Sequence, residues 1–472
     1  MTEPNAAPRS LIWSPLRWLG VGEVLVFTVA AQLAFSLHAP VDTIATVDTA
    51  LWHLAASLAF GFFMAATLHA LGMHAVRTRQ SALQAFFKYV TSAGVAFGVL
   101  WIIVAMSATE TEPVITSQVG AGLAFGYGML FVWRLFVHLL IDSATMRRNV
   151  VVLGAGEGAK AFNDALRRRS DRRGLAIVGF VPMAGDRSGE LEPGRLLHSR
   201  TTLANLCARL RVGEIVIASD DRRGHLPVKD LLECRFHGIE VTQAATFVER
   251  ECGRIPVELV EPSWWLYRSG FAGGGVRRAV KRAFDIVAGT LILVIAAPLM
   301  LACALAIRIE GGTGCSMVFR QVRVGRNGRE FRLVKFRSMR EDAESDGIAR
   351  WATRNDDRVT RVGQFLRKTR LDELPQLLNV LRGDMSLVGP RPERPEFVGD
   401  LARKIPYYAQ RHVMRPGITG WAQMSYPYGA STRDALEKLK YDLYYIKNHS
   451  IAFDIAILLR TVEVVLFGKG AR

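Results

Sequence analysis

One adjacent pair of carboxylates, Asp372-Glu373, lies within a strongly basic C-terminal stretch of the chain. Basic residues precede and follow the pair, several of them in rigid Gly/Pro loops, and they include Lys335, Arg337, Arg367, Arg391 and Arg415. Arginine in a rigid loop suits fixed, bidentate recognition of phosphate. A carboxylate among such cations suits phosphoryl transfer, in which cations and Mg²⁺ neutralise a diphosphate while the carboxylate attacks phosphorus.

Residue type alone leaves plainer interpretations open. Lys335 and Arg337, expected in a strand, could be solvated surface charges, and the Gly/Pro loops could be ordinary turns. Thr369 and Asp372 have the spacing of a helix capping box, but Pro375 would then lie inside the helix, where it costs about 3 kcal/mol. With Asp372 as the cap, Pro375 falls harmlessly in the first turn, and the carboxylates sit at a helix N-terminus that favours a nearby phosphate.

The elements that position the pair begin with an apolar run, Phe284–Ile307, which is long enough to span a bilayer. Pro298 in its middle removes a helical hydrogen bond, and basic residues flank both ends of the run. Because a spanning helix should place one flank outside the cell, we expect a re-entrant helix at 284–307 that enters one leaflet and returns. A proline-kinked span is the alternative. Gly325–Gly328 then predicts a turn between two strands.

The N-terminal part contains stretches that each reach the spanning length of about 20 apolar residues: Trp18–Leu37, Val47–Leu71, Phe86–Ala108 and Val119–Ile141. Basic residues occur before the first, between the second and third, and after the fourth, whereas the two other connections carry only acidic charges. By the positive-inside rule, the N-terminus and everything after Ile141 are cytoplasmic. We therefore expect a four-helix transmembrane region at 1–146, with a soluble helical bundle as the alternative.

Residues 147–246 alternate short β-branched segments with helical patterns, which predicts a Rossmann-like parallel α/β domain. The predicted strands are Asn149–Val152, Ala176–Val181 and Glu214–Ala218. Gly154–Ala159 fits the pattern G-x-G-x-x-A, which lets backbone amides approach a phosphate. No acidic residue ends the second strand to hold a ribose hydroxyl, so a structural or regulatory domain is favoured over one that binds a dinucleotide. A linker is expected at 247–276.

Composition agrees with a membrane protein that handles phosphate. Lys and Arg total 60 against 43 Asp and Glu, a net charge of +17, and 50% of residues are hydrophobic. The apolar residues are unevenly spread, so anionic lipid and a phosphorylated substrate are expected as partners and nucleic acid is not. The 5 cysteines form no CxxC pair, which fits reduced thiols facing the cytosol.

The segments KFRSM, RLDELPQLLNVLRGDMSLVGPRP and RPGITGWAQ, in this order after a proline-broken apolar helix, resemble those of the monotopic phosphoglycosyl transferases, a group of bacterial sugar transferases. The resemblance covers the chain from Arg277 onward. Four predicted spans and a Rossmann-like domain before it are similar to the large subgroup that contains the undecaprenyl-phosphate glucose and galactose phosphotransferases of exopolysaccharide and capsule synthesis. The implied fold is an α-helical transmembrane bundle, a Rossmann-like α/β domain and, at 277–472, a membrane-associated α+β catalytic domain with a re-entrant helix.

The resemblance also implies a mechanism. Asp372 would attack the β-phosphorus of a UDP-sugar and release UMP, and undecaprenyl phosphate would displace the aspartate from the phosphosugar intermediate. Glu373 would assist, and Mg²⁺ is implied with Asp372 as a ligand. The remaining family positions are the phosphate-site residues Lys335, Arg337, Arg367, Arg391, Pro392 and Arg415 and the helix-breaking Pro298, which follows Ala297 where some members carry Ser. The resemblance places the enzyme in the bacterial inner membrane as a multi-pass protein with a cytoplasmic catalytic domain.

Two rival functions remain at this stage. A nucleotide-sugar dehydratase or epimerase usually needs a Tyr-x-x-x-Lys pair, and none of the 10 tyrosines has a lysine four residues later. A non-catalytic scaffold of polysaccharide export would not need the intact Asp372-Glu373 pair. The sequence leaves open which sugar is used, whether the protein is a homo-oligomer, and whether the predicted helix at Ile451–Phe467 is interfacial or part of the core.

Overall fold

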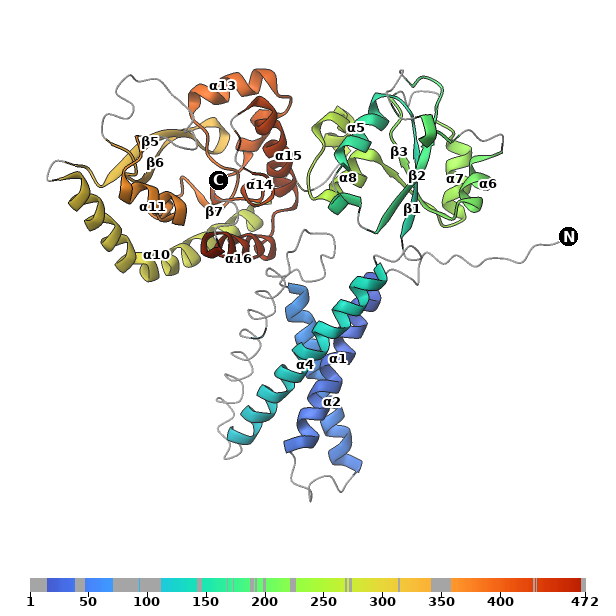
Figure 1. Ribbon diagram of the computed structural model, residues 1–472, viewed down its shortest axis with the longest axis horizontal. Helices are drawn as coiled ribbons and strands as arrows, with labels where there is room; N and C mark the ends of the chain where they lie inside the picture. The colour runs from blue at the N-terminus through green and yellow to red at the C-terminus, as the bar shows by residue number, and fades with distance from the viewer. Residues whose placement is uncertain are drawn as a thin grey trace. The chain divides into compact units, whose positions relative to one another are not determined.

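The computed structural model describes residues 15–38, 47–70, 93, 112–141, 147–167, 169–172, 174–186, 191, 193–197, 201–220, 226–267, 270, 274–312, 315–340, 358–427, 429 and 431–467. The chain divides into two compact units, Met1–Cys252 and Gly253–Arg472 (Figure 1). The first contains an α-helical part and an α/β part, and the second contains the carboxylate pair.

The helical part of the first unit consists of α1 (Pro15–His38), α2 (Val47–Ala70) and α4 (Glu112–Ile141), and α1 packs against both of the others. These helices coincide with the first, second and fourth predicted apolar stretches, and the third, Phe86–Ala108, lies outside the described residues. Their shared core includes Phe27 from α1 and Leu130 from α4.

A buried ion pair joins two of these helices. The guanidinium of Arg134 on α4 donates from Nε to the Glu23 carboxylate on α1 at 2.9 Å, and the Glu23 side chain is fully buried. Two charges inside apolar helices are costly unless they pair with each other. Hydropathy does not show which side chains of two distant helices meet, so the sequence did not reveal this ion pair.

The α/β part is a parallel sheet with strand order β2-β1-β3-β4. Its strands are β1 (Arg148–Leu153), β2 (Leu175–Val181), β3 (Val212–Ile217) and β4 (Glu240–Gln243). Its helices are α5 (Glu157–Ala165), α6 (Leu203–Arg209), α7 (Val228–Phe236) and α8 (Ala244–Cys252), with short 3-10 turns η2 (Arg169–Arg172) and η3 (Pro193–Arg195). The Rossmann-like sheet expected from the sequence is therefore present, with the ends of the three predicted strands moved by one or two residues, and with β4 as a fourth strand that was not predicted.

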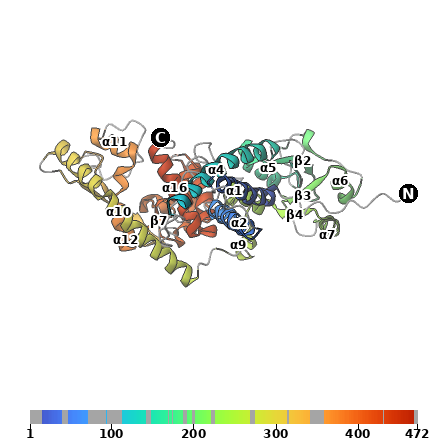
Figure 2. The ribbon, with the colours of Figure 1, turned by 90° about the horizontal axis from the view of Figure 1, so that it is seen from below.

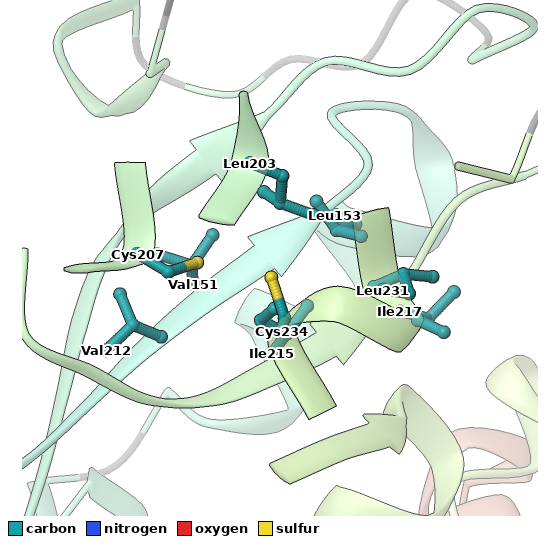
Figure 3. Close-up of a cluster of buried hydrophobic side chains, with 9 residues drawn as sticks. All are labelled: Val151, Leu153, Leu203, Cys207, Val212, Ile215, Ile217, Leu231 and Cys234. Atoms are coloured by element: carbon teal, nitrogen blue, oxygen red, sulfur yellow. The ribbon is translucent and has the colours of Figure 1, made fainter. Parts of the chain in front are cut away.

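Both faces of the sheet are covered, as parallel sheets require. Figure 3 shows one face, where Val151 of β1 and Ile215 of β3 pack with Cys207 of α6 and Cys234 of α7. On strands, side chains alternate between faces, so Val150, Val152 and Val216 belong to the opposite face, and all three are fully buried. Phe162 of α5 and Phe247 of α8 stack edge to face with ring centroids 5.5 Å apart.

The cysteines are free thiols, in agreement with the expectation from their spacing. Burial raises the pKa of Cys207 to about 12, with the neighbouring Cys234 adding to the effect. A thiol with so high a pKa is not a nucleophile at neutral pH, so Cys207 serves packing.

The predicted boundary at residue 246 falls inside α8, and the compact unit extends to Cys252. The physical reason is that Phe247 and Val248 are fully buried, so the helix must complete its contacts with the sheet. The stretch expected to be a linker is also partly folded, as the 3-10 turn η4 (Val257–Leu259) and as α9 (Pro262–Tyr267). Ile255 donates its amide to the Lys440 carbonyl at 3.0 Å, which ties this stretch into the second unit.

The second unit is an α+β assembly. Its longer helices are α10 (Gly275–Gly311), α11 (Arg361–Thr369), α12 (Gln376–Arg382), α13 (Pro395–Lys404), α14 (Trp421–Ser425), α15 (Thr432–Asn448) and α16 (Ile451–Phe467). Strands β5 (Val318–Val324) and β6 (Glu330–Phe336) form an antiparallel hairpin, and β7 (Ser386–Val388) pairs in parallel with β8 (Gly417–Thr419). The turns are η5 (Arg326–Gly328), η6 (Leu371–Glu373) and η7 (Tyr408–Val413). The hairpin turn predicted at Gly325–Gly328 is confirmed.

The core of this unit forms where α12, β7, α15 and α16 meet. Val380, Leu387, Tyr445 and Ile457 are buried there, and side chains of α10 pack against them. The α16 helix thus belongs to the core along one face, while Val462 on the same helix is 55% exposed. The core alternative for Ile451–Phe467 is therefore confirmed for this buried face, and the interfacial alternative stays a prediction.

The 37-residue helix α10 is continuous through Pro298 but bends along its length (Figure 1), and a proline inside a helix is a recognised cause of such bending. Helices α11 and α12 pack along it (Figure 2). Large apolar side chains remain exposed on α10, among them Leu291 at 60% and Ile295 at 71%. Among the described residues, α10 is the one helix long and apolar enough to cross a membrane by length and composition.

Both ends of α10 are attached to the second unit itself. Near its start, Arg282 donates to the carbonyls of Val380 and Leu381 at the end of α12, at 2.6 and 2.7 Å. Near its end, the Glu310 carboxylate accepts the amides of Arg361 and Val362 at the start of α11, at 2.8 and 3.1 Å. The helix therefore leaves this unit and returns to it.

Candidate active site

The carboxylate pair lies in η6, a short 3-10 turn between α11 and α12. Arg370 makes the turn possible, because its backbone adopts the left-handed conformation (φ 61°) that ends α11. Non-glycine residues in this region are uncommon and concentrate at functional sites. Thr369 donates its hydroxyl back to the Phe365 carbonyl at 2.8 Å, so it does not form the capping box. Pro375 is the N-cap of α12, so the pair precedes that helix instead of capping it.

The two carboxylates differ in their partners. Glu373 accepts a hydrogen bond from Arg391 at 3.2 Å and lies 3.6 Å from the Arg370 guanidinium. Asp372 is only 9% exposed, and within the described part of the chain its carboxylate has no hydrogen bond or ion pair within 4 Å. A buried carboxylate without such a partner is costly. Asp372 is therefore the side chain left free to react or to bind a cation.

Three cations lie near Asp372 without contacting it: Lys335 at the end of β6, Arg367 in the last turn of α11 and Arg391 after β7. Burial and the adjacent Glu373 raise the pKa of Asp372 to about 6, and these cations oppose the rise. Burial likewise lowers the pKa of Lys335 to about 8, with Asp372 opposing. Perturbed pKa values in opposite directions within one cluster are typical of catalytic sites.

Asn379, a residue that the sequence analysis did not single out, fixes β6 relative to α12. Its amide accepts from the Val334 backbone N–H at 3.0 Å and donates to the Arg332 carbonyl at 2.9 Å, as a neighbouring strand would. Asn379 is fully buried. The position of Lys335 relative to Asp372 is thus fixed by α12, the helix that follows Asp372, because Asn379 on α12 bonds the neighbouring backbone of β6. No local pattern in the sequence predicts this contact, because it joins residues 45 positions apart.

Arg367 is held in a similar way. Its Nε donates to the hydroxyl of the buried Ser338 at 2.9 Å, directly after β6. Lys335 itself lies under the ring of Phe319 on β5, with the ammonium 5.1 Å from the ring centroid. The hairpin therefore orients both of these cations toward the start of η6.

The structure does not bring every predicted site residue to this cluster. Arg337 donates to the Ser316 carbonyl at 2.8 Å, beside β5. Arg415 donates to the Gly383 carbonyl at 2.8 Å and so, with Arg282, satisfies the C-terminal carbonyls of α12. Pro298 lies inside α10, which continues through it, so the predicted helix break is wrong: the helix bends instead, because the turns on either side keep their own hydrogen bonds. Pro392 follows Arg391, and its carbonyl accepts from Arg323 at 3.2 Å.

The donor set can be compared with what Mg²⁺ requires. Among the described residues no group of three or more His, Cys, Asp or Glu side chains could form a metal cage. Mg²⁺ is usually bound by one or two carboxylates together with substrate phosphates and water. Asp372, with its free oxygens, and the adjacent Glu373 fit that mode of binding.

The glycine-rich loop of the α/β part has a different character. It lies between β1 and β3, where the strand order reverses and where ligands bind in such folds. Here the amides of Glu157 and Gly158 donate to the Asp220 carboxylate at 3.0 and 2.6 Å, and the Ala155 amide donates to Asp186 at 2.7 Å. The protein's own carboxylates thus take the donors that a phosphate would use.

The glycines of that loop also have a packing role. A Cβ at Gly154 would lie 2.7 Å from the backbone of Ala218, and one at Gly158 would lie 2.6 Å from its carbonyl oxygen. Gly154 further has φ 121°, a conformation that other residues rarely adopt. The motif is therefore explained by close packing of β1 and α5 against the end of β3.

Comparison with known proteins identifies the second unit. The sequence profile of the family described as "Bacterial sugar transferase" matches residues 276–468. An undecaprenyl-phosphate glucose phosphotransferase of Komagataeibacter xylinus is 34% identical over 74% of this chain and 65% of its own length. A UDP-N-acetylgalactosamine-undecaprenyl-phosphate N-acetylgalactosaminephosphotransferase of Aeromonas hydrophila is 48% identical over 41% of this chain and 45% of its own length.

A third relative is matched over most of its sequence. The UDP-glucose:undecaprenyl-phosphate glucose-1-phosphate transferase of Caulobacter vibrioides is 45% identical over 39% of this chain and 69% of its own length. The chain thus spans less than two thirds of the Komagataeibacter and Aeromonas proteins but more than two thirds of this one. All three matches agree with the resemblance carried by the motifs around Asp372. The chain belongs to the bacterial sugar transferase family.

Proposed function

We propose that this protein transfers hexose 1-phosphate from a UDP-sugar, with glucose or galactose as the hexose, to undecaprenyl phosphate and so starts an exopolysaccharide or capsule repeat unit. The observation that carries the proposal is the contrast within the carboxylate pair. Asp372 is buried and free of hydrogen bonds among the described residues, whereas Glu373 is held by Arg391. A carboxylate nucleophile needs that freedom, and a diphosphate needs the surrounding cations.

The first step is attack by an Oδ atom of Asp372 on the β-phosphorus of the UDP-sugar. The bond between this phosphorus and the oxygen that bridges to UMP breaks, and UMP leaves with the bonding electrons. The guanidinium groups of Arg367 and Arg391 stabilise the charge that develops on the phosphoryl oxygens and on UMP. The product on the enzyme is an acyl phosphate, in which the sugar phosphate is joined to the Asp372 carboxylate as a mixed anhydride.

In the second step, a phosphate oxygen of undecaprenyl phosphate attacks the same phosphorus, and the Asp372 carboxylate leaves. The result is undecaprenyl-diphospho-hexose and the free enzyme. Lys335 stays beside the reacting carboxylate through both steps and offsets the charge that returns to it. Glu373 keeps Arg391 in place through their hydrogen bond. Mg²⁺, bound at Asp372, would supply further neutralisation of the diphosphate.

The lipid substrate requires that the site lie at the height of the headgroups. The exposed apolar face of α10 supports membrane insertion of this helix. Its attachment at Arg282 to α12 and at Glu310 to α11 supports a re-entrant path, because both ends belong to one compact unit.

The same proposal assigns residues 1–146 to a transmembrane bundle, 147–246 to the Rossmann-like domain and 277–472 to a cytoplasmic catalytic domain at the inner membrane. The apolar helices α1, α2 and α4 support the first assignment. The basic residues that flank them support the orientation.

The test is incubation of the purified full-length protein with undecaprenyl phosphate, Mg²⁺ and a panel of UDP-sugars, with release of UMP as the readout. The panel includes UDP-glucose, UDP-galactose and UDP-N-acetylgalactosamine, because the named sugars of the relatives differ. We expect lipid-dependent turnover with one hexose preferred. Absence of UMP with every sugar in the panel would refute the proposed function.

A further inference from the structure

We propose that Asp442 and Arg411 are positioning residues for the transfer: they hold the main chain at Arg391 so that its guanidinium stays beside the carboxylate pair. This inference rests on the proposed function for its kinetic consequence. Asp442 lies on α15 and Arg411 in η7, so the link joins elements that follow the site in the chain. Neither residue contacts Asp372 or Glu373 in the described structure.

The segment that carries Arg391 has few ways to be fixed. It reads Gly389-Pro390-Arg391-Pro392-Glu393, and the two prolines lack the N–H that would anchor a loop. The Gly389 amide donates to the Thr419 carbonyl at 2.9 Å, and the carbonyls of the following residues hold the rest of the segment. In order along the loop, these accept from the Gly417 amide (2.9 Å), the Arg411 guanidinium (2.9 Å), the Arg323 guanidinium (3.2 Å) and the Val324 amide (3.0 Å). The bond from Arg411 is the one made to Arg391 itself.

Arg411 is suited to this bond because its own position is fixed. Its Nη2 donates both to the Arg391 carbonyl and to Asp442 Oδ2, each at 2.9 Å. Its Nη1 donates to the Tyr408 hydroxyl at 2.6 Å. The side chains of Arg411 and Asp442 are only 6% and 3% exposed. A planar guanidinium can make these bonds at once, whereas a lysine ammonium cannot reproduce the fork.

Burying the Arg411–Asp442 ion pair costs solvation free energy, and this cost suggests that the pair fixes geometry and adds little to stability. Two charges taken out of water regain through their attraction at most about what they lose in solvation, so a buried ion pair adds little to stability. Its effect is on geometry, because it allows one arrangement of α15, η7 and the loop. Without Asp442, Arg411 would keep the Tyr408 hydroxyl and the Glu393 carboxylate, which lies 4.0 Å from its Nη1, and a shift of the guanidinium toward Glu393 would release the Arg391 carbonyl. The guanidinium of Arg391 would then lose its fixed distance to Glu373.

The experiment compares Asp442→Asn with Glu437→Gln, a matched control on the same helix. Glu437 also pairs with an arginine, Arg254 at 3.1 Å, but that pair does not reach the loop. Replacing Asp442 should lower kcat for UMP release by about 10- to 100-fold, the scale expected for a misplaced catalytic group, with little change in KM. The control should stay within about twofold of the wild type. A wild-type kcat in the Asp442→Asn variant would overturn the inference.

A double-mutant cycle separates positioning from general loss of structure. If Asp442 acts through Arg391, the loss from Asp442→Asn should largely disappear in an Arg391→Ala background. The same fold loss in both backgrounds would contradict the inference. If Asp442→Asn melts below the assay temperature, Arg411→Lys carries the same cycle, since it keeps the charge and removes the fork.

Hydrogen exchange gives a readout that does not depend on turnover. Deuterium uptake at residues 389–394 should rise in Asp442→Asn and remain unchanged in Glu437→Gln, and unchanged uptake in Asp442→Asn would count against the link. A wild-type protein that releases no UMP would refute the proposed function alone, because the exchange measurement would still decide whether Asp442 fixes the loop.

Discussion

Two regions of this chain have the composition expected of a phosphate site: the glycine-rich loop Gly154–Ala159 and the cluster of cations around Asp372. They differ in whether carboxylates of the protein already occupy the donor groups. At Gly154–Ala159 the backbone donors are already bonded to Asp186 and Asp220. Around Asp372 the cations Lys335, Arg367 and Arg391 make no ion pair with that carboxylate in the described structure, although Arg391 donates to the neighbouring Glu373. Their charge is therefore only partly offset and suits binding of a diphosphate. Donors that the chain's own carboxylates already occupy are therefore weak evidence of a phosphate site, whereas the cations around Asp372 remain the candidate site.

The largest effect is expected from removing the free carboxylate. Asp372→Asn should lower UMP release by about 10⁴-fold or more, because a nucleophile acts as a unit with its partners and cannot be replaced by an amide. Asp400→Asn, on α13, is the control: Asp400 is exposed and pairs only with Arg403 among the described residues. Initial rates of UMP release measure both. Substantial turnover by Asp372→Asn would contradict the assignment of Asp372 as the nucleophile and of Glu373 as its supporting neighbour.

The pH profile tests whether the same two groups titrate in the working enzyme. The pKa of Asp372 is raised to about 6 and that of Lys335 is lowered to about 8. Asp372 must be ionised to attack, so the rate should fall about tenfold per unit as the pH drops below 6. Loss of the Lys335 charge should lower the rate as the pH rises above 8.

Lys335→Arg provides the control for the alkaline limb, because a guanidinium does not titrate in this range. The variant should retain the acid limb and lose the alkaline one. An alkaline limb that persists in Lys335→Arg would assign the titration to another group.

A smaller effect concerns stability. The raised pKa of Asp372 means that the folded state disfavours its ionised form, so the charge destabilises the protein at neutral pH. Asp372→Asn should therefore raise the free energy of unfolding by roughly 1–3 kcal/mol above pH 6. This gain should shrink as the pH falls from 6 through the unfolded-state pKa of 3.8, and it should vanish only below about pH 3, where the wild-type carboxyl is neutral in the folded and the unfolded state. Melting curves at pH 7.5 and pH 4.5 would show the difference, and equal shifts at both values would argue against a buried, unpaired charge.

The smallest effect on turnover is expected in the glycine-rich loop. Asp220→Ala frees the amides of Glu157 and Gly158, which should cost about 1 kcal/mol of stability, as for other helix caps. UMP release should stay within about twofold of the wild type. Wild-type protein should show no thermal shift with NAD or NADP, because the donors are taken. A clear thermal shift with either nucleotide would mean that the ligand displaces Asp220 from the amides of Glu157 and Gly158, and that the glycine-rich loop also binds phosphate.

Much of this arrangement could be predicted from local patterns. Apolar length located α1, α2 and α4, and β-branched segments located β1, β2 and β3 within one or two residues, whereas the short strand β4 was missed. The sequence also placed Lys335, Arg367 and Arg391 with the carboxylate pair, and the structure brings them near Asp372. These features are encoded by neighbouring residues or by motifs that recur in the family.

Other features depend on contacts between distant segments and could not be predicted locally. Arg415 looks like a phosphate ligand, yet the carbonyls that end α12 need a donor, and it supplies one to Gly383. Arg411 looks like a surface charge in a polar stretch, yet it is buried against Asp442. The Asp220 carboxylate lies 62 residues from Gly158, so the occupied state of the loop was not visible in its glycine spacing.

The measurement that tests the central claim most directly is a single turnover without undecaprenyl phosphate. The enzyme is mixed with its preferred UDP-sugar, UMP is quantified, and the peptide that contains Asp372 is examined by mass spectrometry. The proposed mechanism predicts a burst of about one UMP per active site and a hexose-phosphate adduct on Asp372, lost on addition of undecaprenyl phosphate. UMP release that requires the lipid from the first turnover, with an unmodified Asp372 peptide, would contradict it.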